Sequence, residues 1–109
     1  MIPSAALRQT LTIRPRAGEG AAGPVYGEPV TYPARIEEKH RQVRDSAGNV
    51  RVSDLVAWLR PDVAVAVGDQ AITFGRALAV LSVTEMRGLT QLEGYELALG
   101  EPGAGRAAR

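Results

Sequence analysis

The clearest strand signal in this sequence is the run Gln9-Thr10-Leu11-Thr12-Ile13-Arg14. Its side chains alternate, with Leu11 and Ile13 on one face and polar residues on the other, which is the pattern of a half-buried β-strand. Thr and Ile also suit a pleated surface. Pro15 ends the run, so we expect a short strand here.

The same alternation recurs along the chain. In 30–37, Pro33 indicates a sheet edge or a bulge, because it has no N–H to donate. Residues 50–59 begin in alternation and then change phase, as a β-bulge or a strand entering a core would produce. The run 77–84 is apolar on both faces for much of its length, which favours a central strand. Further runs with a shared apolar face lie at 63–67 and 95–99, and a turn at Gly68-Asp69 leads into another run at 71–74.

Short strands separated by turn signals, without a helical period, predict an all-β fold. We expect a small antiparallel β-barrel, or a barrel-like sandwich, with long loops and a mobile C-terminal tail at 100–109. The length of 109 residues suits a single domain, residues 1–109, with an ordered core at about 8–100. The residues expected to be buried are Leu11, Ile13, Ile36, Val65, Ile72, Leu81, Val83, Tyr95 and Leu97.

A Gly- and Pro-rich loop is expected at 15–29. Such a composition leaves little to pack, so the segment is either a flap that orders against a partner or a plain surface loop. Val25 and Tyr26 are its only bulky apolar residues. They are therefore the candidate partner-docking residues.

A second loop, at 38–49, is polar and basic. Between residues 39 and 51 there are four Lys or Arg residues and one Asp, so the local charge is four minus one, or +3, on a chain whose net charge is +1. A basic loop of this kind can touch phosphate backbone without sequence preference, or it can be a solvated connector. The candidate channel-loop or DNA-contact residues are Lys39, His40, Arg41, Arg44 and Asp45.

The composition offers little for catalysis or for holding a cofactor. The chain has no Cys, which excludes disulfides, thiolate nucleophiles and Cys-ligated zinc. His40 is the only His and lies in a polar stretch, and no spaced cluster of metal-ligating residues is present. We therefore expect no catalytic residue, no metal and no cofactor. No apolar run approaches the roughly 18 residues of a membrane span, and the N-terminus does not resemble a signal peptide, so no membrane partner is expected.

Several segments in a fixed order carry a resemblance to a known family. They are Leu11-Thr12-Ile13-Arg14-Pro15, Tyr26-Gly27-Glu28-Pro29-Val30, Pro33-Ala34-Arg35-Ile36-Glu37, Val43-Arg44-Asp45-Ser46-Ala47-Gly48-Asn49, Val67-Gly68-Asp69, Val80-Leu81-Ser82-Val83, and Leu89 through Tyr95-Glu96-Leu97. In order, spacing and length, the chain resembles the head-to-tail stopper, or head-completion, proteins in the neck of siphovirus-type bacteriophages.

The resemblance implies a structural virion protein without enzymatic activity, made in the host cytoplasm and located at the head-tail interface. It implies a homo-oligomeric ring, twelve- or six-fold, that closes the portal channel after DNA packaging and provides a platform for the tail. The implied partners are a portal or adaptor protein above, a tail terminator or tail-completion protein below, and packaged double-stranded DNA, contacted non-specifically.

In this family a long loop between the second and third strands helps to close the channel. The matching segment here is Glu38 to Asn49, which departs from the family in being Arg-rich and poor in bulky apolar residues. It either pairs edges with ring neighbours or grips the DNA end electrostatically.

An alternative from another class is a free-standing small-barrel module that binds single-stranded nucleic acid. Such modules stack bases on aromatic side chains. Aromatic residues make up only 5% of this chain and are not interleaved with the basic residues, which counts against this alternative.

Overall fold

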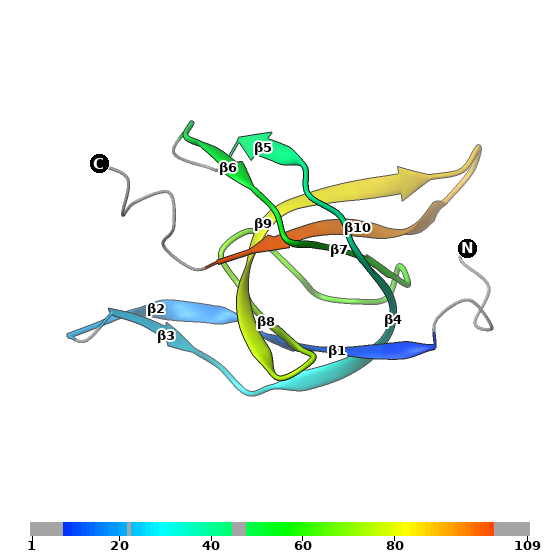
Figure 1. The fold of residues 1–109 in the computed structure, drawn as a ribbon. Coiled ribbons are helices and arrows are strands. Elements are labelled where there is room, and N and C mark those ends of the chain that lie inside the picture. The colour runs from blue at the N-terminus through cyan, green and yellow to red at the C-terminus, as the bar shows by residue number, and fades with distance from the viewer. Residues whose placement is uncertain (1–7, 22, 45–47, 102–109) are drawn as a thin grey trace.

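The computed structural model of this protein describes residues 8–21, 23–44 and 48–101 (Figure 1). The described residues form β-strands joined by turns and loops, without a helix. The strands are β1 (Gln9–Arg14), β2 (Arg16–Gly20), β3 (Gly23–Tyr26), β4 (Val30–Glu38), β5 (Gln42–Arg44), β6 (Val50–Val52), β7 (Leu55–Leu59), β8 (Gln70–Thr73), β9 (Arg76–Arg87) and β10 (Leu92–Gly100).

Six strands form a closed antiparallel barrel in the order β1-β4-β7-β10-β9-β8. The barrel closes where β1 pairs with β8, with Thr12 opposite Ile72 and Ile13 opposite Ala71. The prediction of an all-β fold with a small antiparallel barrel is therefore confirmed. β9 pairs with both β8 and β10, but it is no more central than the other barrel strands, because each strand of the closed barrel has two neighbours.

The barrel interior holds one apolar core. The alternation predicted for β1 is present, because Leu11 and Ile13 point inward and are almost fully buried. The side chains that line the core are Leu11, Ile13, Ala34, Ile36, Leu55, Ala57, Leu59, Val63, Ala71, Leu78, Val80, Leu97 and Leu99. Val65, Val83 and Tyr95 are partly buried and pack against this core, so only part of their surface is covered.

Two of the residues expected in the core lie on the outer face of the barrel instead. Ile72 is half-buried, because its neighbours Ala71 and Thr73 take the inward positions of β8. Leu81 is buried but does not belong to the interior core. A register shift between β9 and β10 leaves Leu81 without a partner residue, since Ala98 pairs with Ser82 and Leu99 with Val80. This β-bulge changes which side chains of β9 point inward. Before the bulge, Leu78 and Val80 point into the core. After it, Val83 packs against the core.

The two predicted loops are largely hairpins. In the segment 15–29, β2 pairs with β3. In the segment 38–49, β5 pairs with β6, which directly follows this segment. We call β2–β3 the glycine-rich arm and β5–β6 the basic arm. Each arm prolongs a pair of barrel strands, because β1 and β4 lead into the glycine-rich arm and β4 and β7 into the basic arm. In Figure 1 the two arms extend from the barrel in different directions.

Three shorter segments differ from or refine the strand pattern expected from the sequence. The run 63–67 is not a strand, because Asp69 Oδ2 accepts a hydrogen bond from the Ala66 backbone N–H at 2.9 Å and bends the chain there. Pro33 lies one residue before β4 begins to pair with β7, so no strand on that side needs its N–H. Gly100, expected at the start of a mobile tail, is instead buried as the last residue of β10. Residues 102–109 of the expected tail lie outside the described part.

The interior core should control stability. Leu97 is fully buried, and we expect Leu97→Ala to lower the free energy of unfolding by about 2–5 kcal/mol, because it leaves a cavity in a close-packed interior. Leu89 is fully exposed and provides the matched control. Leu89→Ala should change stability by no more than about 0.5 kcal/mol. Urea unfolding followed by the fluorescence of the single Trp would measure both, and equal effects would contradict this core assignment.

Candidate functional site

The basic arm is joined to the barrel through a short root at residues 39–41 and 53–54. Regular pairing stops there, since β4 pairs with β7 as far as Glu38 opposite Leu55 and resumes as β5–β6 at Gln42 opposite Val52. The predicted phase change near Ser53 is this interruption. The root is held by backbone hydrogen bonds from Ser53 N to Arg41 O at 2.9 Å and from Lys39 N to Asp54 O at 3.2 Å.

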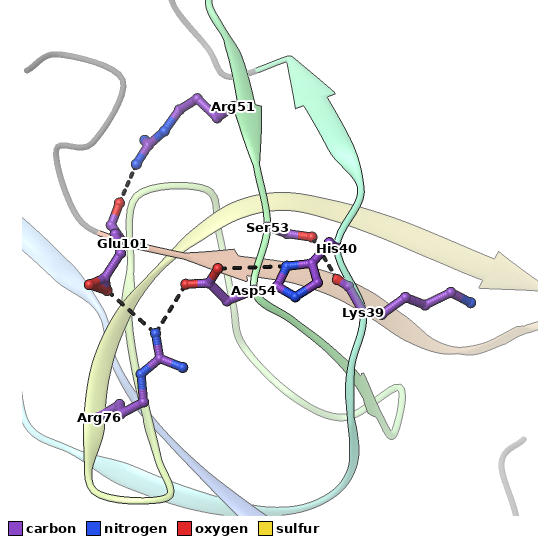
Figure 2. Close-up of polar contacts among 7 residues, drawn as sticks. All are labelled: Lys39, His40, Arg51, Ser53, Asp54, Arg76 and Glu101. Atoms are coloured by element: carbon purple, nitrogen blue, oxygen red, sulfur yellow. Dashed lines mark hydrogen bonds and ion pairs between the residues drawn. The ribbon is translucent and has the colours of Figure 1, made fainter. Parts of the chain in front are cut away.

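Asp54 is the centre of a polar cluster at this root (Figure 2). One carboxylate oxygen accepts a hydrogen bond from Arg76 Nη2 at 3.0 Å, and the other lies 3.9 Å from His40 Nδ1. Arg76 also lies 3.6 Å from the Glu101 carboxylate. Arg51 of the arm donates to the Glu101 backbone carbonyl. The cluster therefore connects the root of the arm with the start of β9 and the end of β10.

The predicted contact residues separate into different environments. Lys39 and Arg44 are exposed, although Arg44 Nη1 donates to the Gly48 carbonyl at 2.6 Å. The His40 side chain is 64% exposed and faces Asp54. Arg41 is half-buried and forms an ion pair with Glu96 of β10. The exposed positive charges of this group are therefore Lys39 and Arg44, whereas Arg41 connects the arm to the barrel. Asp45 lies outside the described residues.

The sequence did not indicate Arg76, Asp54 or Glu101 as part of this region. Arg76 and Asp54 come from different strand pairs and meet only because the barrel register brings the start of β9 beside the root of the arm. No local sequence pattern predicts a contact between strands that are far apart in the chain. Arg51 was one of the four cations counted in the basic stretch, and its half-buried position against Glu101 also depends on the fold.

The second candidate pair, Val25 and Tyr26, lies on β3 of the glycine-rich arm. Val25 is 47% exposed and available for contact. Tyr26 is half-buried at the base of the arm, where the Arg14 guanidinium lies 5.8 Å from the centre of its ring. Arg14 Nε also donates to the Gly27 carbonyl at 3.2 Å. Tyr26 therefore helps to hold the arm, and Val25 is the more accessible residue of the pair.

The base of the glycine-rich arm is further fixed by Asp69. This buried carboxylate accepts hydrogen bonds from the backbone N–H of Arg16 at 3.0 Å and of Ala66 at 2.9 Å. A charged acceptor strengthens both bonds. The arm thus leaves the barrel at a defined position, held by a carboxylate 53 residues away from Arg16 in the sequence.

The comparisons with known proteins add no family to this description. No protein-family model matches the chain, and no curated protein sequence matches it significantly. Within the described part of the chain, no group of three or more His, Cys, Asp or Glu residues is placed to hold a metal ion. Over the same residues, no helix has the length and apolar character to cross a membrane.

The different environments of the arm cations should be measurable as stability. We expect Arg41→Ser to lower the free energy of unfolding by on the order of 1 kcal/mol, because it removes a partly buried ion pair that is only partly screened by solvent. Lys39→Ser and Arg44→Ser should each stay within about 0.5 kcal/mol of the unsubstituted protein. Thermal unfolding of the three single variants would test this, and equal losses would mean that Arg41 does not support the arm.

Proposed function

We propose that this protein is a structural component of a bacteriophage neck, a head-to-tail stopper that closes the portal channel after DNA packaging and provides the attachment platform for the tail. In this proposal it acts without catalysis, as a homo-oligomeric ring between a portal or adaptor protein and a tail terminator or tail-completion protein. Its location is then the head-tail interface of the virion.

The main support is the basic arm with its root, which continues two barrel strands. The root presents Lys39 and the arm presents Arg44 to solvent. A single exposed cation contributes little, because salt screens it. In a ring, the same charges are repeated around one axis, where a highly charged duplex end would meet all of them at once. A hairpin is also stiffer than an open loop, so the arm carries its charge as one unit.

The glycine-rich arm supports a second contact. It carries an exposed Val25 on a two-stranded sheet whose base is held by Arg14, Tyr26 and Asp69. A small apolar group on an anchored hairpin suits contact with another protein better than contact with DNA. We assign this arm to the neighbouring neck proteins and the basic arm to the channel.

The assembly state is the first test. We expect the isolated protein to be a monomer at low micromolar concentration and to form rings only on a portal or adaptor, since each single contact is small and gains from many copies binding together. Light scattering of the isolated chain and electron microscopy of the mixture would show this. A closed ring without a partner would contradict partner-dependent assembly, and no binding to any neck protein would contradict the proposed function.

The second test is DNA retention. In a phage carrying this protein, the double variant Lys39→Ser/Arg44→Ser should yield heads that lose packaged DNA or fail to join tails, while the purified variant keeps its stability. The matched control is Arg35→Ser/Arg87→Ser, which removes two exposed barrel arginines and the same net charge. Normal particles from the arm variant would show that the arm is a solvated connector.

The same variants separate the proposal from the alternative of a nucleic-acid-binding module. A module would bind single-stranded oligonucleotides as a monomer, with an affinity that falls steeply as salt rises. Tight, salt-dependent binding by the monomer, lost in Lys39→Ser/Arg44→Ser and without interaction with neck proteins, would favour the module.

A further inference from the structure

The barrel has a second buried apolar region, on its outside. Val56, Leu81 and Ala98 are almost fully buried, yet none of them belongs to the interior core. Val56 and Ala98 are opposite each other on β7 and β10, between residues whose side chains point inward. A Cβ at Gly100 would lie 2.7 Å from Leu81 Cδ1, which places Leu81 on the same outer side. We call Val56, Leu81 and Ala98 the outer patch.

The basic arm lies over this outer patch. β5 runs against β9, and the Val52 carbonyl oxygen would be only 3.2 Å from a Cβ at Gly100, beside Leu81. The arm's own strands alternate, with Val43 and Arg51 half-buried and Gln42, Arg44, Val50 and Val52 exposed. In Figure 1, β5 and β6 are seen above β9 and β10. The arm therefore covers apolar surface of the barrel without being part of the barrel sheet.

The contacts that hold the arm in this position are mostly polar and partly open to solvent. Arg41 pairs with Glu96, with side chains 37% and 23% exposed, and Arg51 donates to Glu101. Val43 is the one apolar residue on the covered face of the arm's described strands, whereas Val50 and Val52 point to solvent. Solvent reaches the Arg41–Glu96 ion pair in part, so salt can weaken it.

We propose that the basic arm is a releasable cover, which opens at its root and exposes the outer patch while the barrel stays folded. The two strands of the arm pair only with each other among the described residues, and the root interrupts the ladder on both sides. The arm can therefore move as a unit without breaking barrel pairing. Segments with few apolar contacts and exposed hydrogen bonds open at lower free energy than the core. The cover does not depend on the neck role proposed above.

A thiol-labelling experiment tests this directly, because the chain has no native Cys. Ala98→Cys places a thiol in the outer patch, and Ala57→Cys places one in the interior core on the neighbouring strand. The Ala98→Cys thiol should react at least tenfold faster than the Ala57→Cys thiol, because it needs only the arm to open. Labelling of the Ala98→Cys thiol should also rise about two- to fivefold when salt or a substitution removes the Arg41–Glu96 attraction.

Glu96→Gln and Arg41→Gln are the substitutions that remove this attraction. They change the local charge in opposite directions, so an effect on thiol ionisation would move the two labelling rates oppositely, whereas arm opening raises both. The matched control is Glu85→Gln, which breaks the exposed Arg87–Glu85 pair away from the arm and should leave the rate unchanged.

The larger side chain of Ala98→Cys could itself disturb packing in the outer patch. A second measurement therefore uses protein without an added Cys. In the single variant Glu96→Gln, the rate of trypsin cleavage after Arg51 should rise about two- to fivefold over the unsubstituted protein. In the single variant Glu85→Gln, this rate should stay unchanged. The proposal is overturned if the Ala98→Cys and Ala57→Cys thiols react at the same rate. It is equally overturned if neither Glu96→Gln nor Arg41→Gln changes labelling and cleavage.

Discussion

Pairing between β1 and β8 is the interaction on which the rest of this structure depends. It joins the first described strand to a strand far along the chain, with Thr12 opposite Ile72, and turns a sheet with two open edges into a barrel. Closure encloses the core around Leu97 and also brings Asp69 beside Arg16, where it fixes the base of the glycine-rich arm. The pairing of β1 with β8 therefore determines both the enclosed core and the position of the glycine-rich arm.

Barrel closure leaves the two arms as the pairs of strands outside the barrel sheet among the described residues. A closed sheet has no free edge for another strand to extend. The chain instead continues its paired strands beyond the barrel, as β2–β3 and β5–β6. The basic arm lies over the outer patch. In its root, Arg41 holds the arm through Glu96, whereas Lys39 faces solvent.

Local alternation was sufficient to predict the barrel strands and the antiparallel class, because Leu11 and Ile13 need only their neighbours to define an inward face. It failed where pairing is irregular, since the bulge at Leu81 and the register of Ile72 are set by strands elsewhere in the chain. The glycine-rich arm and β5 were missed because Gly and charged residues carry little alternation, whereas β6 lies in the alternating start of the run 50–59. Of the polar cluster at the arm root, the sequence named His40 as a candidate. It did not single out Asp54, Arg76 and Glu101, because only the fold brings these residues together.

The continuity of the basic arm with β4 and β7 has a mechanical consequence. A force applied at the arm is passed lengthwise into these two strands, which are held on their outer sides by β1 and β10. Such a force loads the hydrogen bonds of both ladders in shear, so that many must break together, whereas a force that peels the arm from the outer patch meets its contacts one at a time. The arm is thus stiff along its axis and compliant across it.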